Sequence, residues 1–280
     1  MRLFFTAALA SLALAALSSC TQNGSISWRR ISMDASRTGV TACGPDNVAQ
    51  TLGTVDDSLY HAPSGKVFGK ETATYKAAKA LIAAQPTMAE VKVIVAHSPR
   101  EMSIGDYPES PLGDWFVDIL MAEAAKRTGK KVHLGIANSG GVRIDMPAGD
   151  VLVDDILSMF PFKNTLCYIE MKGSAIRPIL DSLAANKWQQ VGGAKCFVKG
   201  KKLESVEIGG APLDDNKTYG VASISFLLNG GDRIYLARNA SKVIDTKVKV
   251  SDIILPYVKN LTAQGKLIEC CPDGRIIITE

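Results

Sequence analysis

Residues 132–143 read Val-His-Leu-Gly-Ile-Ala-Asn-Ser-Gly-Gly-Val-Arg, an apolar run followed by a glycine turn and an arginine. The run over residues 132–137 is typical of a buried strand. The glycines after it allow close approach of the backbone and leave N–H groups free for an anion. Arg143 adds a planar, permanently charged group suited to phosphate or carboxylate. On its own, the segment Asn138–Arg143 fits an ordinary tight turn with a surface arginine equally well.

Around this stretch, the apolar spacing predicts helices and strands without a regular alternation. We expect helices over residues 71–85, 112–128, 153–160, 174–184 and 250–264, the second being the clearest amphipathic one. We expect further strands over residues 91–96, 165–171, 194–199, 203–208, 218–225 and 275–279. Pro86 should end the first helix, Pro256 should kink the last one, and Gly173 should lie in a turn. The mixture predicts an α+β (mixed α/β) fold with layered mixed sheets and flanking helices.

The start of the chain has the composition of an export signal. A basic N-terminus precedes an apolar run over residues 3–17 that is too short to cross a bilayer, and small residues then lead to Cys20. This pattern resembles a bacterial lipoprotein signal, in which residues 1–19 are the signal peptide and Cys20 is lipidated. The alternatives are an ordinary secretory signal, cleaved near Ala15 or Ser19, and a buried helix.

The lipoprotein interpretation implies a three-part chain. Residues 20–68 would be a tether followed by extended structure around the domain, and residues 69–280 would be the domain itself. We expect an exported protein, periplasmic or at the cell surface, that is anchored to the membrane by lipid and does not span it.

Charge and cysteine content exclude some classes of function. The formal net charge is +4 and the two signs are interspersed, which disfavours a nucleic-acid surface. No Cys-x-x-Cys pair occurs, so a structural zinc site is not expected. Five cysteines follow Cys20, an odd number that leaves at least one free in a monomer. Cys270-Cys271 could supply one bridge with an unknown partner, whereas Cys167 and Cys196 fit buried thiols.

Four segments in order carry a family resemblance. They are residues 109–114 (ESPLGD), 138–143 (NSGGVR), 160–166 (FPFKNTL) and 225–232 (SFLLNGGD). Together they resemble the C-terminal, substrate-specificity domain of the 5′-nucleotidase and UDP-sugar hydrolase family, over roughly residues 90–280.

The resemblance implies a set of ligand-binding residues. Phe162 and Phe226 would stack on a nucleobase, Asn164 would hydrogen-bond its edge, Asp232 would accept from the ribose, and Asn138 with Arg143 would line the ribose–phosphate side. Residue type alone allows other roles, because phenylalanines are often core residues and Asp232 and Asn164 both suit turns.

Some positions depart from the family pattern. The family usually has glycine where Ser139 and Lys163 stand, and often where Arg233 stands. It also carries one or two arginines shortly before the Leu-Gly helix start, whereas residues 103–109 contain none and Arg100 is the nearest.

The catalytic half of the family is a di-metal phosphoesterase, and its motifs are missing from this sequence. Such a centre needs clustered histidines and carboxylates, whereas this sequence holds three separate histidines, His61, His97 and His133. No Gly-x-Ser-x-Gly elbow or cysteine–histidine pair occurs, and Asp154-Asp155 suits a helix start. We therefore expect no cofactor in this chain, with divalent metals only in a separate catalytic partner.

Three functions are compatible with these patterns. The first is a nucleotide- or nucleoside-binding specificity subunit of a split 5′-nucleotidase, partnered by a separate metallophosphoesterase polypeptide and not catalytic alone. The second is a binding-only surface lipoprotein for nucleosides, sugar nucleotides or another phosphorylated ligand. The third is an interaction module with a degenerate site.

Overall fold

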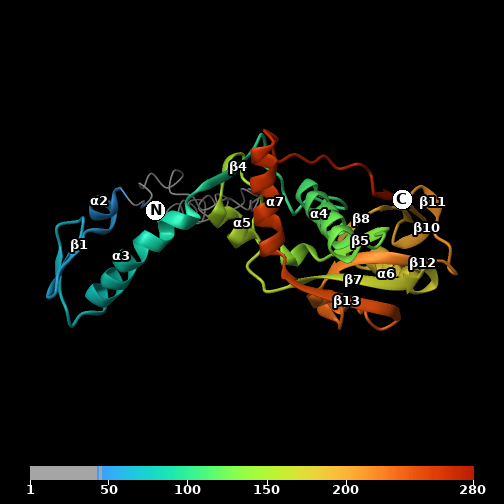
Figure 1. Ribbon diagram of the computed structural model, residues 1–280, viewed down its shortest axis with the longest axis horizontal. Coiled ribbons are helices and arrows are strands. Elements are labelled where there is room, and N and C mark those ends of the chain that lie inside the picture. The colour runs from blue at the N-terminus through green and yellow to red at the C-terminus, as the bar shows by residue number, and fades with distance from the viewer. Residues whose placement is uncertain (1–42, 44–45) are drawn as a thin grey trace, which may run out of the picture. The chain divides into compact units, whose positions relative to one another are not determined.

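The computed structural model describes residue 43 and residues 46–280 (Figure 1). The proposed signal peptide, Cys20 and most of the tether lie outside the described residues. Within the described range, no helix combines the length and the apolar character needed to cross a membrane.

The N-terminal part of the described chain is a short helix, a small sheet and a long helix. Helix α2 (Val48–Leu52) precedes strands β1 (Thr54–Val55), β2 (Leu59–His61) and β3 (Val67–Gly69), which form an antiparallel sheet in the order β1-β2-β3. This sheet contacts α3 (Ala73–Val91), and the Tyr75 hydroxyl donates to the Asp56 carbonyl at 2.7 Å. Within the segment expected to be extended, residues 48–52 are therefore helical and strands β1, β2 and β3 pack against α3.

Helix α3 does not end at Pro86 as expected. A proline removes only its own N–H, and the helix continues to Val91, where the Lys92 N–H still donates to the Met88 carbonyl at 3.2 Å.

A five-stranded mixed sheet forms the centre of the domain, in the order β13-β7-β12-β5-β8. Its strands are β5 (Leu134–Ala137), β7 (Thr165–Lys172), β8 (Gln190–Gly192), β12 (Thr218–Ile224) and β13 (Ala240–Lys249). Strand β12 runs parallel to β5 and antiparallel to β7. All four residues of β5 are buried, which confirms the buried strand predicted over residues 132–137.

Helix α4 (Pro111–Thr128) packs against this sheet, as the amphipathic pattern predicts (Figure 1). The Ser110 hydroxyl accepts from the Gly113 N–H at 3.1 Å and caps the first turn, and Gly129 ends the helix with φ 64°. More of the helix is buried than one face, because Trp115 and Val117 are also inside.

A second sheet has the order β11-β10-β9-β14, and two further strands pair separately. The four strands are β9 (Ala194–Lys199), β10 (Lys202–Ile208), β11 (Ala211–Pro212) and β14 (Ile276–Thr279). Strands β4 (Ile94–Ser98) and β6 (Gly149–Leu152) form the antiparallel pair. The remaining helices are α5 (Val153–Met159), α6 (Gly173–Ala185) and α7 (Ser251–Ala263). Gly173 thus starts α6, which corrects the expected turn.

The C-terminal segment, residues 265–275, runs from α7 to β14 (Figure 1) and is fastened at several points. The Ile268 N–H donates to the His97 carbonyl at 2.9 Å, and the Arg100 guanidinium donates to the Cys270 carbonyl at 2.6 Å. Further along, the Glu109 carboxylate accepts from the N–H groups of Asp273 at 2.6 Å and Arg275 at 2.7 Å. These bonds join the end of the described chain to the start of α4.

The five cysteines in the described range are all free. The anticipated bridge from Cys270-Cys271 is therefore not formed in this structure. Cys167 and Cys196 are buried, and burial raises the pKa of each thiol to about 12. Both fit the expected role of inert core residues.

Candidate ligand site at one edge of the central sheet

The topology of the central sheet brings three of the four motif segments to one edge. Strands β5 and β12 are parallel, so their carboxyl ends, followed by Asn138 and by Ser225, lie at the same edge. Strand β7 is antiparallel to β12, with Leu166 opposite Ile224, so its amino end lies there too. The Ser225 hydroxyl accepts from the Thr165 N–H at 3.0 Å and ties the two segments together.

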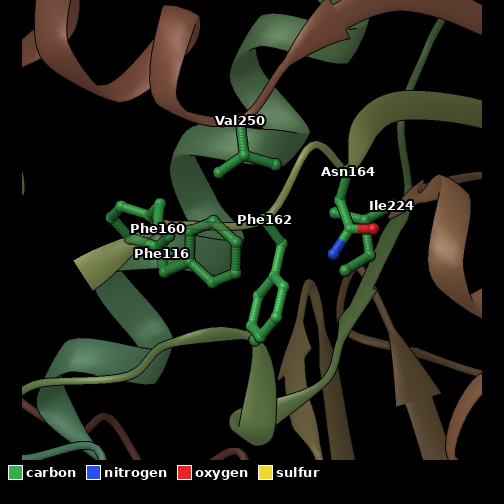
Figure 2. Close-up of a pocket in the computed structure, with 7 residues that line it drawn as sticks. Phe116, Phe160, Phe162, Asn164, Ile224 and Val250 are labelled. Atoms are coloured by element: carbon green, nitrogen blue, oxygen red, sulfur yellow. The ribbon is translucent and has the colours of Figure 1, made fainter. Parts of the chain in front are cut away.

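A pocket opens at this edge, as Figure 2 shows. Its buried apolar wall consists of Phe116, Phe160, Ile224 and Val250. The rings of Phe116 and Phe160 lie 4.8 Å apart with a tilt of 36°. Gly141, Phe162 and Asn164 complete the lining, so two of the residues expected to bind a base lie beside each other in one pocket.

Phe162 is not a core residue. Its side chain is 46% exposed, although four neighbouring pocket residues are buried. Figure 2 shows the ring beside the Asn164 amide. The backbone of Asn164 is fixed by its carbonyl, which accepts from the Val250 N–H at 3.0 Å at the start of α7. The backbone bond thereby holds Asn164 at the pocket that its side chain lines.

Arg143 lies over the ring of Phe162. Its guanidinium carbon is 5.7 Å from the ring centroid, and Nη1 donates to the Gly140 carbonyl at 3.1 Å. No carboxylate in the described range forms an ion pair with this arginine. An exposed guanidinium beside an aromatic ring can accept a phosphate without first breaking a salt bridge.

Asn138 is buried, with 5% of its surface exposed. Its side-chain Oδ1 has no hydrogen-bond partner and lies 2.8 Å from the position that a Cβ on Gly141 would take. A buried acceptor without a donor is costly, so this atom is suited to a ligand N–H or O–H, or to water. Asn138 therefore lies next to Gly141, which lines the pocket.

Phe226 and Asp232 lie in the loop after β12. Phe226 is 43% exposed, and a Cβ on Gly231 would come within 2.6 Å of its ring, so only glycine permits this packing. Asp232 is exposed and has φ 48°, a left-handed conformation that asparagine and aspartate tolerate better than most residues. Within the described residues, no ring contact joins Phe226 to Phe162.

Arg100 does not take the place of the arginines missing before α4. Its guanidinium is bound to the Cys270 carbonyl and to Cys271 Sγ at 2.7 Å, and this contact with Cys271 raises the pKa of Arg100 further. The residues before α4 serve another purpose, because Glu109 holds the C-terminal segment. The motif over residues 109–114 therefore supports the site and does not line the pocket.

The three histidines lie on separate elements. His61 pairs with Asp56 at 3.7 Å and His97 with Asp150 at 3.1 Å. His133 Nδ1 accepts from the Gly220 N–H at 2.9 Å, and burial lowers the pKa of its ring. In residues 43 and 46–280, no three His, Cys, Asp or Glu side chains gather in a way that could hold a metal ion.

The carboxylates at Asp154-Asp155 act at a helix start, as the sequence indicates. Asp155 accepts from the Leu152 N–H at 2.8 Å at the first turn of α5. Burial raises the pKa of Asp155, and the bond from Leu152 opposes that effect.

The sequence patterns did not predict a role for several residues around the site. Gln190, the first residue of β8, and Gln189 just before it hydrogen-bond to Ser139. In the loop after Asp232, the guanidinium of Arg238 lies 4.2 Å from the ring centroid of Tyr235. Strand β8 has three residues, too few for a periodic signal, and neither Gln190 nor Gln189 just before the strand belongs to a motif.

Comparison with known proteins places these motifs in a wider group. The family described as 5′-nucleotidase, C-terminal domain matches residues 87–238, more than half of the 280-residue chain. Protein UshA of Yersinia enterocolitica is 32% identical over 146 residues, covering 50% of this chain and 26% of that protein. A 5′-nucleotidase of Vibrio cholerae is 34% identical over 134 residues, covering 46% of this chain and 24% of the relative. The chain thus spans about a quarter of the length of these curated relatives.

Solved structures agree on the fold. A 5′-nucleotidase precursor from Thermus thermophilus has a TM-score of 0.63 at 25% identity, over 79% of this chain and 49% of that chain. The NAD nucleotidase of Haemophilus influenzae has a TM-score of 0.54 at 20% identity, over 79% of this chain and 48% of that one, and shows the fold alone. The predicted α+β architecture is confirmed.

Proposed function

This chain belongs to the family of 5′-nucleotidase C-terminal domains, and on that premise we propose that it binds a nucleotide or nucleoside in the pocket beside Phe162. We further propose that it acts as the specificity subunit of a split 5′-nucleotidase-type phosphohydrolase. In this proposal, a separate metallophosphoesterase polypeptide cleaves the phosphate that this chain positions.

The convergence of the motif segments at one sheet edge carries the proposal. Phe162, Asn164 and Gly141 line one pocket, and Arg143 lies beside it without a carboxylate partner among the described residues. Phe162 follows α5 and Phe226 follows β12, and both phenylalanines are exposed. A phenylalanine that only stabilised the fold would more often be buried. Exposed rings suit base stacking, which contributes about 1–3 kcal/mol per base and tolerates every base.

Charge favours a phosphorylated ligand over a neutral one. Arg143 offers a guanidinium at the end of a glycine turn, the arrangement that suits a phosphate or carboxylate group. Asp232 is the acid that we assign to the ribose hydroxyls. The Asn164 amide, which can both donate and accept, is assigned to the base edge.

Catalysis is assigned to another polypeptide because the sequence carries no di-metal motif. The expected reaction needs two metal ions that generate a hydroxide and stabilise the phosphate charge. We propose that this chain alone does not hydrolyse nucleotides. Metal-dependent phosphatase activity that copurifies with the full chain through several independent steps would contradict this assignment.

The proposed cellular location of the protein rests on the resemblance of its N-terminus to a lipoprotein signal. We propose that the protein is exported and anchored through a lipid on Cys20, on the periplasmic or outer face of a membrane. Metabolic labelling with a radioactive fatty acid, lost in Cys20→Ser, would support this. A soluble, unlabelled mature protein would contradict it.

Calorimetry on the full chain with AMP, adenosine and UDP-glucose tests the binding proposal. Phe162→Ala and Phe226→Ala should each weaken binding at least about tenfold, by loss of one stacking ring. Phe68→Ala, in the separate sheet β1-β2-β3, is the matched control and should leave affinity unchanged. Absence of binding at millimolar ligand would refute the proposal, and unchanged hydrolysis by candidate phosphoesterases on adding the chain would refute the subunit role alone.

One observation favours a different function. The Arg100 guanidinium binds the C-terminal segment, so fewer arginines are free before α4 to bind a phosphate than in the family pattern. This supports a binding-only protein for nucleosides or another phosphorylated ligand, or an interaction module with a degenerate site. Adenosine binding as tight as AMP binding would favour the nucleoside-binding alternative.

A further inference from the structure

We propose that Gln190 is a positioning residue for the phosphate side of this pocket, holding the turn Asn138–Arg143 in shape through Ser139. The inference rests on the proposed ligand binding but concerns residues outside the expected binding set. Gln190 is the first residue of β8 and lies opposite Ala137, the last residue of β5. It therefore stands next to the point where the turn leaves the sheet.

Gln189 and Gln190 bind the N–H and the hydroxyl of Ser139. The Gln190 Nε2 donates to the Ser139 hydroxyl at 2.8 Å, and the Ser139 N–H donates to Gln189 Oε1 at 2.8 Å. Gln190 is 6% exposed and Ser139 is half-buried, so the bond between them is partly shielded from competing water. Ser139, the second residue of the turn, is thus fixed by two residues at the start of β8.

Gly113 in α4 provides the space for this arrangement. A Cβ at Gly113 would collide with Gln190 Oε1 and come within 2.6 Å of the Ser110 hydroxyl. The Gln190 amide therefore lies directly against the capped first turn of α4. Through Gln190, the helix start in one motif segment supports the glycine turn in another.

The position of Arg143 depends on the same turn. Its Nη1 donates to the Gly140 carbonyl, and its N–H donates to the Met159 carbonyl at 3.0 Å. Inside the turn, the Val142 N–H donates to the Ser139 carbonyl at 3.2 Å. A shift of Ser139 would therefore move Gly140 and turn the guanidinium away from its place over Phe162.

The experiment combines ligand titration with amide hydrogen exchange on the full chain. Gln190→Leu removes the donor with little change of size, Ser139→Ala removes the acceptor, and the double variant tests their coupling. Gln264→Leu, at the exposed end of α7, is the matched control. The probes are AMP and adenosine, which differ by the phosphate alone.

We expect Gln190→Leu to weaken AMP binding about fivefold to tenfold, as expected for one buried hydrogen bond, and to leave adenosine binding within about twofold. Amide exchange in residues 139–142 should accelerate while exchange in β7 stays unchanged. Ser139→Ala should reproduce both effects, and the double variant should add nothing further.

Two results would overturn the positioning role. One is unchanged exchange in residues 139–142 of Gln190→Leu, and the other is an equal loss of AMP and adenosine affinity, which would indicate a general structural role. If the wild-type chain bound neither ligand, the proposed function would fail. Amide exchange in residues 139–142 would still decide whether Gln190 fixes the turn. If Gln190→Leu does not fold, the same exchange measurement is made on Ser139→Ala.

Discussion

The guanidinium of Arg143 lies 5.7 Å from the centroid of the Phe162 ring. The arginine that we expect to bind phosphate and the ring that we expect to stack on the base are therefore immediate neighbours. A cation–π contact at an exposed site contributes about 0.5–1 kcal/mol. A phosphate can displace that contact, because charge-assisted bonds to a guanidinium are roughly twice as strong as neutral ones.

Arg143→Ala should therefore weaken AMP binding about tenfold or more, since it removes a charge-assisted contact. Arg143→Lys should recover part of the loss, because it keeps the charge but not the planar fork. Adenosine affinity should change little in both variants. Calorimetry gives these values, with Arg177→Ala, an arginine of α6 paired with Asp215, as the control. An equal effect on both ligands would contradict the assignment of Arg143 to phosphate.

Gly231→Ala should destabilise the loop that carries Phe226 and Asp232. The new Cβ would collide with the Phe226 carbonyl and approach its ring to 2.6 Å, and backbone atoms cannot move away cheaply. Overpacking of this kind costs about 1–3 kcal/mol in the free energy of unfolding. Urea denaturation measures it against Gly69→Ala, where a Cβ would meet nothing within 4 Å. Equal stability of the two variants would show that the loop adjusts freely.

Asp114 should make stability depend on pH. Burial raises the pKa of its carboxyl from 3.8 to about 8, although the Arg275 guanidinium, 3.7 Å away, acts in the opposite direction. The folded state then retains a proton that the unfolded chain releases near pH 4, so this contribution to stability is complete below about pH 4 and declines until about pH 8.

Asp114→Asn should remove that decline, because an amide does not titrate. Its stability relative to wild type should therefore rise between about pH 5 and pH 8, measured by urea denaturation at several pH values. Asp181→Asn, an exposed carboxylate of α6, is the control and should follow wild type. Parallel pH profiles for Asp114→Asn and wild type would disprove the raised pKa.

Glu109→Ala should loosen the C-terminal segment. Its carboxylate accepts from the N–H groups of Asp273, Gly274 and Arg275, and removing it leaves these donors unpaired. The expected cost is about 1–3 kcal/mol in unfolding free energy. Amide exchange should rise locally in residues 273–276, whereas Glu204→Gln, at an exposed position of β10, should change neither quantity. Unchanged exchange in this segment would contradict the role of Glu109.

The regular part of the fold is readable from the sequence where apolar spacing is strong. Helix α4 and strands β5, β7 and β12 lie close to their predicted bounds, since each buries an apolar pattern of ordinary length. Strand β13 escapes prediction because it is an edge strand with few buried positions, and β8 because it is very short. Edge position and length depend on neighbours that a local pattern does not contain.

The candidate site is readable only as separate segments. The motifs around Asn138, Phe162 and Phe226 are visible in the sequence, but their convergence follows from the strand order β7-β12-β5. The contacts of Ser139 with Gln190 and of Glu109 with Arg275 join residues far apart in the chain, and no short motif encodes them. Tertiary pairing of polar side chains is therefore the part that sequence patterns miss.

The bonds from Glu109 to Asp273 and Arg275 span 164 and 166 residues of sequence, and this has a consequence for folding. A chain delivered from its N-terminus can pair all five strands of the central sheet once residue 249 has emerged. The start of α4, against which Gln190 rests, gains its last partners only when residues 273–276 follow. Because long loops close slowly, we expect the pocket edge to mature last, after the sheet that carries it has already formed.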